Sequence, residues 1–319
     1  MDILYHLTIL PPKFPEREAL SQEIAALCQH FGGELNYVNP NQTSPFYLPR
    51  LLFGFHQLKQ LQAREAHNVQ AHHFYNPDPF PFPVLRWLKR PIIYSVSSGV
   101  GPKQPNVNFF KSMVVVAVAD ERSLKRLRDW GIDNTRLVRP GIDTTRFTHT
   151  LVPLGPDIRL MVGSAPWTKA QFRTKGVDAL LEAARQDSRL QLVFLWRGVL
   201  TAEIERRDDQ LYLNKQVTVL DGLVDVNEVL ATVHASITLA SRPGLVKSYP
   251  HSLLESLAAG KPVLVSQAIP MADYVAETGC GKVIEKVTPE AILIAIEAVS
   301  YTHLTLPTTG SWGGGGGGG

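Results

Sequence analysis

The sequence predicts an α/β protein made of two doubly wound domains that face each other across a cleft. Apolar runs alternate with amphipathic stretches along most of the chain, as expected for parallel strands connected by helices. The alternation restarts after residues 148–157, where two prolines and a glycine indicate a linker. The length of 319 residues also allows about two domains. We therefore expect a first domain in residues 1–150 and a second in residues 151–298.

In the first domain, apolar runs predict strands at residues 3–10, 34–38, 68–74, 91–96 and 113–119, and residues 136–138 precede a turn at Pro140-Gly141. Helical spacing predicts helices at residues 15–31, 49–66 and 120–130. The run MVVVAVA at 113–119 is apolar throughout, which favours a strand buried on both faces. His72 and His73 are neighbours on a strand, so their side chains should point to opposite faces.

The second domain repeats the pattern. Strands are expected at residues 158–162, 190–196, 217–220, 235–239 and 262–266. Helices are expected at residues 176–186, 226–233, 249–259 and 289–298, and residues 163–175 should form a long loop. Ligands of such folds bind at the carboxyl ends of the strands, so this loop is the first place to look for a site.

Composition and charge narrow the class of partner. Residues 1–150 hold 17 Lys and Arg against 12 Asp and Glu, a charge of about +5, while the remainder is slightly acidic. This excess of positive charge is typical of a domain that binds a phosphorylated ligand or an anionic membrane face. It is too small to indicate binding of nucleic acid. Two distant cysteines and the lack of a long apolar run favour a cytoplasmic protein, with peripheral contact at the inner membrane face.

The end of the chain differs from the rest. Residues 299–319 read VSYTHLTLPTTGSWGGGGGGG. One choice of codons for residues 299–308 is similar to a transposon sequencing adapter, and the glycine run is similar to the poly-G that follows a short read. A disordered tail or an engineered linker is the alternative. We expect a non-native or disordered tail, and a native protein that continues beyond about residue 298.

Two clusters in the second domain indicate phosphate and ribose chemistry. Gly163, Ser164 and Lys175 stand at its first strand-to-helix turn, where backbone N–H groups and a lysine can hold a diphosphate. Glu255 lies on the helix at 249–259, where a carboxylate can accept two ribose hydroxyls. A dinucleotide oxidoreductase is disfavoured, because Gly99-Val100-Gly101 lacks the third glycine of that motif.

In this order the motifs resemble the retaining nucleotide-sugar glycosyltransferases of family 4, the glycosyl transferases group 1. These enzymes have the GT-B fold of two Rossmann-like domains. The resemblance covers nearly all of residues 1–298 and rests on RPGID at 139–143 with Phe147, on Lys175-Gly176, on DGL at 221–223 and on LESLAAGKPV at 254–263. The last block is the most specific.

The resemblance implies roles for particular residues. Glu255 matches the glutamate that holds the donor ribose, and Lys175 matches the basic residue that binds the donor diphosphate. The full set of donor-binding candidates is Gly163, Ser164, Lys169, Arg173, Lys175, Gly222, Leu223, Ser248, Tyr249, Pro250, His251, Ser252, Leu253, Leu254 and Glu255. Lys247 and Ser97 are the candidate catalytic residues.

Four positions depart from the family pattern. Lys247 replaces a glutamate near the donor sugar, and Ser97 replaces a histidine close to the reacting carbon. Residues 13–15 replace a Gly-Gly loop. The arginine that usually follows the glycine at position 163 is Ser164, so Lys169 or Arg173 would substitute for it.

The resemblance therefore implies transfer of a sugar from a UDP- or GDP-linked donor to an acceptor hydroxyl with retention of configuration. Cell-surface or lipid-linked glycan synthesis is the expected setting. The acceptor would be a glycan, a lipid-linked molecule or a small molecule. No cofactor and no bound metal are implied. The departures leave a divergent active enzyme, an altered donor and a non-catalytic nucleotide-sugar- or glycan-binding relative as alternatives.

Overall fold

The computed structural model describes residues 2–12, 15, 18–196, 200–213 and 216–300. Its described residues fall into two compact units. The first comprises Met1–Gly141, Arg242–His251 and Ile269–Met271, and the second comprises Ile142–Ser241, Ser252–Ala268 and Ala272–Gly319. The domain bounds 1–150 and 151–298 remain predictions. Most of the tail expected at 299–319 lies outside the described residues.

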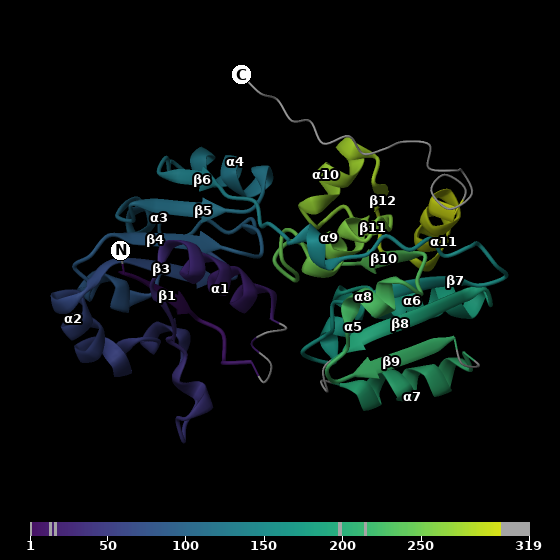
Figure 1. Ribbon diagram of the computed structural model, residues 1–319, viewed down its shortest axis with the longest axis horizontal. Helices are drawn as coiled ribbons and strands as arrows, with labels where there is room; N and C mark the ends of the chain where they lie inside the picture. Colours follow the sequence, from purple (N-terminus) through teal and green to yellow (C-terminus); the bar gives the residue numbers. More distant parts are fainter. Residues whose placement is uncertain (1, 13–14, 16–17, 197–199, 214–215, 301–319) are drawn as a thin grey trace. The chain divides into compact units, whose positions relative to one another are not determined.

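The first unit is built on a parallel sheet with the strand order β2-β1-β3-β4-β5-β6 (Figure 1). Its strands are β1 Asp2–Leu7, β2 Glu34–Tyr37, β3 Val69–Asn76, β4 Ile92–Val96, β5 Val115–Val118 and β6 Thr135–Leu137. Its helices are α1 Ala19–Phe31, α2 Leu58–His67, α3 Val107–Lys111 and α4 Glu121–Asp129. Single 3-10 turns occur at η2 Pro40–Gln42, η3 Arg50–Leu52, η4 Phe55–Gln57 and η5 Pro83–Trp87.

Both faces of this sheet are covered by apolar packing. On one face, Tyr5, Leu7 and Tyr75 pack against Leu20 and Ile24 of α1. The opposite face carries a larger cluster in which strand residues such as Phe74 and Tyr94 pack against η5 and α3. Because every strand is parallel, all carboxyl ends of the strands meet at one edge of the sheet.

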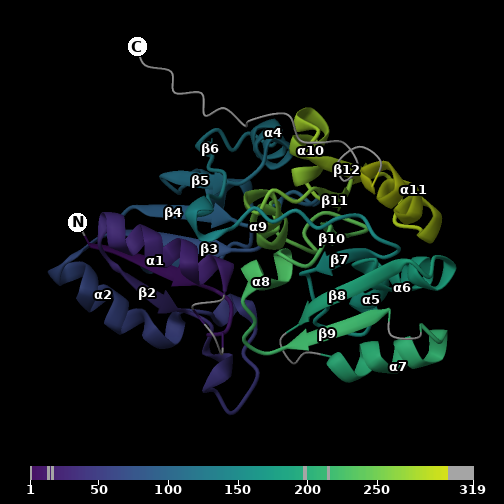
Figure 2. The same cartoon turned by 45° about the vertical axis from the view of Figure 1, so that its right-hand side comes forward.

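The second unit repeats this plan with the strand order β12-β11-β10-β7-β8-β9. Its strands are β7 Ile158–Val162, β8 Leu190–Trp196, β9 Val217–Asp221, β10 Ala235–Thr238, β11 Val263–Ser266 and β12 Gly281–Ile284. Its helices are α5 Ala170–Thr174, α6 Val177–Gln186, α7 Thr201–Leu211, α8 Val226–Leu230, α9 His251–Ala258, α10 Met271–Thr278 and α11 Pro289–Val299. The turn η6 Thr144–Arg146 precedes β7, and Figure 2 shows α7 beside the edge strand β9.

The second core also has two sides. Alternate residues of β7 point to opposite faces: Leu160 packs toward α6 and α11, whereas Met161 packs against Leu230 of α8. Trp196, Phe194 and Phe172 form edge-on aromatic contacts within the larger cluster. The expected α/β class, with two parallel doubly wound sheets, is thus confirmed.

Some predicted elements are wrong in detail. The helix expected at 49–66 is two 3-10 turns followed by α2, because Gly54 has a left-handed backbone (φ +83°) that interrupts a helix there. Within the described residues, α1 begins at Ala19 rather than Pro15, and the loop expected at 163–175 contains α5. The helix α7 was not predicted. The helix α11 extends to Val299, one residue into the segment expected to be a tail.

Candidate active site

The second sheet reverses its strand order beside β7. The chain proceeds from β7 to β8 and β9 on one side, and then to β10, β11 and β12 on the other. The connections that follow β7 and β10 therefore depart in opposite directions and leave an opening at the carboxyl ends of these two strands. Gly163 follows β7, and α9 lies on the connection between β10 and β11.

Gly163 and Ser252 are in close contact. A Cβ placed on Gly163 would lie 2.4 Å from the Cβ of Ser252, so no larger residue fits at position 163 without movement. The glycine thus brings the end of β7 against the first turn of α9. That turn has backbone N–H groups without helical partners, which are suited to an anionic ligand.

Lys175 contacts the loop that follows Gly163. Its Nζ donates to the backbone oxygen of Ala165 at 2.8 Å and lies 3.4 Å from the Oγ of Ser164. The side chain is only 7% exposed, and burial lowers the pKa of its amine to about 8. Lys175 is therefore a buried cation with neutral oxygen partners, held next to the loop that follows β7.

Lys169 and Arg173 lie elsewhere on the loop and α5. Lys169 is exposed, and its Nζ is 3.3 Å from Oε2 of Glu203 on α7. Arg173 is exposed on α5. Within the described residues, neither side chain forms a hydrogen bond with Lys175. The structure therefore brings Gly163, Ser164 and Lys175 together and leaves the two substitute cations outside that group.

The remaining second-unit candidates lie directly after β9 and on α9. Gly222 follows β9 with φ +108°, and the Leu223 side chain is 58% exposed. Such an exposed apolar side chain at a strand end can stack on a planar ring. Glu255 is half-buried, three residues after Ser252 and hence on the same side of α9. Leu253 is buried and Leu254 half-buried, so these two side chains help to pack the helix.

In the first unit, Ser97 and Ser248 are in contact through their backbones. The Ser248 N–H donates to the Ser97 oxygen at 3.3 Å. The buried Ser248 hydroxyl donates to Oδ2 of Asp120 at 2.6 Å. Asp120 also caps α4 by accepting from the Ser123 N–H at 2.7 Å. The segment Arg242–His251 is thereby fixed beside the carboxyl ends of β4 and β5.

Lys247 is half-buried in the same segment. Burial lowers the pKa of its amine, and the neighbouring carboxyls of Glu18 and Glu23 partly oppose that effect. Burial also raises the pKa of Glu23, and it lowers the pKa of His251 to about 4. Tyr249 and Pro250, which stand between Lys247 and His251 in the sequence, are buried. The electrostatic partners of the Lys247 amine are thus the carboxyls of Glu23 on α1 and of Glu18, the residue that precedes α1.

Asp120 is the residue that sequence reasoning missed. From the sequence it indicates only the start of a helix, because its partner Ser248 is 128 residues away. The sequence analysis also singled out residues 13–15, of which Lys13 and Phe14 lie outside the described residues.

Among the residues that the structure describes, no three His, Cys, Asp or Glu side chains are grouped so that they could hold a metal ion.

A family model matches most of the second unit and two short segments of the first, residues 242–251 and 269–271. Residues 161–300 match the model of the glycosyl transferases group 1. The chain carries a group 1 glycosyltransferase domain. This domain includes Gly163, Lys175 and Glu255, and its presence supports a sugar-transfer function. No curated protein shows significant similarity to the chain.

Solved structures of glycosyltransferases share the fold. Sucrose-phosphate synthase from Thermosynechococcus elongatus is 15% identical, with a TM-score of 0.69 over 95% of this chain and 90% of that chain. HepE from Anabaena, in complex with UDP, is 14% identical with a TM-score of 0.65 over 94% and 90%. WaaG, a glycosyltransferase involved in lipopolysaccharide biosynthesis, is 16% identical with a TM-score of 0.64 over 93% and 90%. The chain therefore has the GT-B fold.

Proposed function

We propose that this chain is a retaining glycosyltransferase that moves a hexose from a nucleotide sugar to an acceptor hydroxyl. The observation that carries the proposal is the corner formed by Gly163, Ser164 and Lys175 within the group 1 domain. It combines a buried cation, close backbone approach and the first turn of α9. This combination suits a diphosphate.

The proposed chemistry follows from the charges. As the sugar–phosphate bond breaks, positive charge grows on the sugar and negative charge on the leaving diphosphate. The Lys175 amine and the N–H groups of α9 would stabilise the leaving group. The acceptor hydroxyl would attack from the same face, and the departing phosphate would take its proton. Glu255 would accept hydrogen bonds from the donor ribose, and Leu223 would contact the base.

For the donor, we favour a UDP-sugar, because HepE has been solved with UDP-glucose. A GDP-sugar is the alternative. For the acceptor, we favour a cell-surface or lipid-linked glycan, because WaaG is involved in lipopolysaccharide biosynthesis. The excess of cations in residues 1–150 supports peripheral contact with an anionic membrane. In the described part of the chain, no helix has both the length and the apolar character needed to span a bilayer.

The experiment measures the melting temperature with UDP, UDP-glucose and GDP-mannose, followed by release of free nucleotide diphosphate with and without acceptors. We expect one nucleotide sugar to raise the melting temperature. Glu255→Gln should weaken its binding about 10- to 100-fold, because a charged hydrogen-bond acceptor is lost. Glu277→Gln changes an exposed carboxyl of α10 and serves as the matched control. Equal binding by both variants would refute the ribose role of Glu255.

A non-catalytic nucleotide-sugar- or glycan-binding relative is the second candidate. The surroundings of Lys247 favour it, because the carboxyls of Glu18 and Glu23 already interact with that amine. Turnover separates the two candidates. Binding of a nucleotide sugar without hydrolysis or transfer to any acceptor would establish the second candidate and exclude the first.

A further inference from the structure

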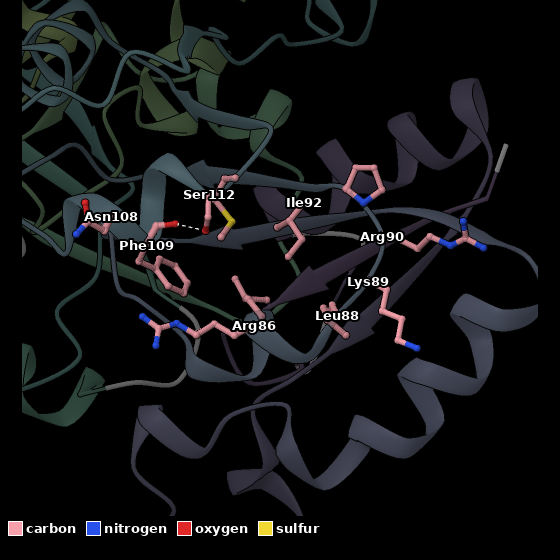
Figure 3. A pocket seen from close by; sticks show the side chains of 11 residues that line it. Arg86, Leu88, Lys89, Arg90, Ile92, Asn108, Phe109 and Ser112 are labelled. Atoms are coloured by element: carbon pink, nitrogen blue, oxygen red, sulfur yellow. Dashed lines mark hydrogen bonds between the residues drawn. The ribbon is translucent and has the colours of Figure 1, made fainter.

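A pocket of about 630 Å³ lies in the first unit at the amino end of β4 (Figure 3). Its apolar wall is formed by Leu85, Leu88, Ile92, Phe109 and Met113. Ser97 follows the opposite end of β4, about 15 Å away at the usual rise of a strand. The pocket is therefore separate from the residues considered for catalysis.

Three cations surround this apolar wall. Arg86 lies on one side of the pocket, and Lys89 and Arg90 lie on the other (Figure 3). All three side chains are exposed. The Arg90 side chain donates to the backbone oxygen of Glu65, and the Glu65 carboxylate accepts from the backbone N–H groups of Lys89 and Arg90. Among the described residues, no carboxylate forms an ion pair with any of the three.

The segment between these cations adds an apolar anchor. Trp87 follows Arg86 at the end of η5, and its side chain is 58% exposed. A tryptophan with cations beside it is the combination that is enriched at the boundary between a bilayer and water. A free inorganic anion would need the cations but would gain nothing from an apolar wall and an exposed indole.

We propose that this pocket and its rim bind the phosphate headgroups of an anionic phospholipid bilayer. The cations would pair with lipid phosphates, Trp87 would enter the interfacial region, and the apolar wall would contact the glycerol and upper acyl carbons. The inference rests on the membrane contact in the proposed function and assigns that contact to one surface. The pocket belongs to the first unit, whereas the carboxyl ends of β7 and β10 belong to the second.

The test uses the full chain in cosedimentation with vesicles of phosphatidylcholine, with and without phosphatidylglycerol. The variant Arg86→Gln/Lys89→Gln removes two rim cations. The variant Lys59→Gln/Lys103→Gln removes two exposed cations of the same unit outside the pocket and is the matched control. We expect the rim variant to lose about 25-fold in affinity for anionic vesicles, roughly fivefold for each cation, and the control to lose much less. Trp87→Ala should weaken binding without changing its dependence on salt.

Equal losses in the rim and control variants would overturn the assignment, since binding would then follow total charge. Displacement of the protein from vesicles by glycerol 1-phosphate would also overturn it, because the pocket would then take a soluble phosphate. The shift in melting temperature caused by the nucleotide is measured in parallel for each variant. If that shift is absent in the unmodified chain but the rim variant still loses vesicle binding, the membrane surface stands and the proposed function fails.

Discussion

The hydroxyl of Ser248 donates a hydrogen bond of 2.6 Å to the carboxylate of Asp120, across 128 residues of sequence. Both side chains are buried. Asp120 also accepts from the N–H and the hydroxyl of Ser123, so one carboxylate joins the start of α4 to the segment that contains Lys247. The bond fixes the position of a segment that the sequence alone assigns to the donor domain.

Removing this bond should loosen the segment selectively. We expect Ser248→Ala to lower the free energy of unfolding by about 1–2 kcal/mol and to speed amide hydrogen exchange in residues 242–251. Ser123→Ala removes another hydroxyl from the same carboxylate and is the control. It should cost a similar stability but leave exchange in the segment unchanged. Unchanged exchange in both variants would mean that Asp120 does not fix the segment.

The low pKa of Lys175 predicts that nucleotide affinity depends on pH. Only the protonated amine attracts a diphosphate, and burial lowers its pKa to about 8. Affinity for UDP should therefore fall as the pH rises through about 8, by at most about tenfold per pH unit. Calorimetric titration between neutral and alkaline pH measures this. Lys175→Met should weaken binding at neutral pH and flatten the profile, whereas Lys169→Met should do neither. An unchanged profile in Lys175→Met would exclude Lys175 from the phosphate site.

The contact between Gly163 and Ser252 can be tested by a double-mutant cycle. Gly163→Ala places a Cβ 2.4 Å from the Cβ of Ser252 and should cost about 1–3 kcal/mol of stability, with loss of nucleotide binding. Gly155→Ala, whose Cβ would meet nothing within 4 Å, is the control. Ser252→Gly in the same chain should relieve part of the cost. Strictly additive changes in melting temperature would contradict the proposed contact.

A buried polar chain in the first sheet should make the protein sensitive to acid. His6 Nε2 is 2.9 Å from His72 Nδ1, and His72 Nε2 is 3.0 Å from Oε1 of Glu65. Burial is the main cause that lowers the pKa of both histidines, and Arg64 adds to it. Backbone and histidine hydrogen bonds lower the pKa of the Glu65 carboxyl against the effect of burial.

Below about pH 6.5 the unfolded chain therefore binds protons at these histidines that the folded chain does not bind. Because the pKa of Glu65 is also lowered in the folded chain, its protonation on further acidification favours the unfolded chain as well. Stability should fall as the pH decreases through this range, by at most about 1.4 kcal/mol per pH unit for each histidine. Denaturant unfolding at several pH values measures the slope. His6→Phe should reduce stability at neutral pH and also reduce the slope. A slope equal to that of the unmodified chain would show that His6 does not titrate in this way.

The sequence predicts regular elements well where the pattern is local and continuous. The buried run around β5 and the start of α4 at Asp120 follow from apolar residues and a capping side chain. The prediction is wrong around Gly54, because the backbone there depends on packing against Val84 as well as on local spacing. The helix α7 was missed because its weakly periodic sequence contains few apolar residues.

By itself, the sequence determined the α/β class, the repeat of the doubly wound pattern and the resemblance carried by LESLAAGKPV. Each of these depends on neighbouring residues, whose spacing sets which face is buried. Only the tertiary structure decided that Lys175 lies against Ser164, that Lys169 pairs with Glu203, and that Ser248 reaches Asp120. These contacts join side chains from different elements, and the direction of a side chain becomes fixed only when the sheets and helices pack.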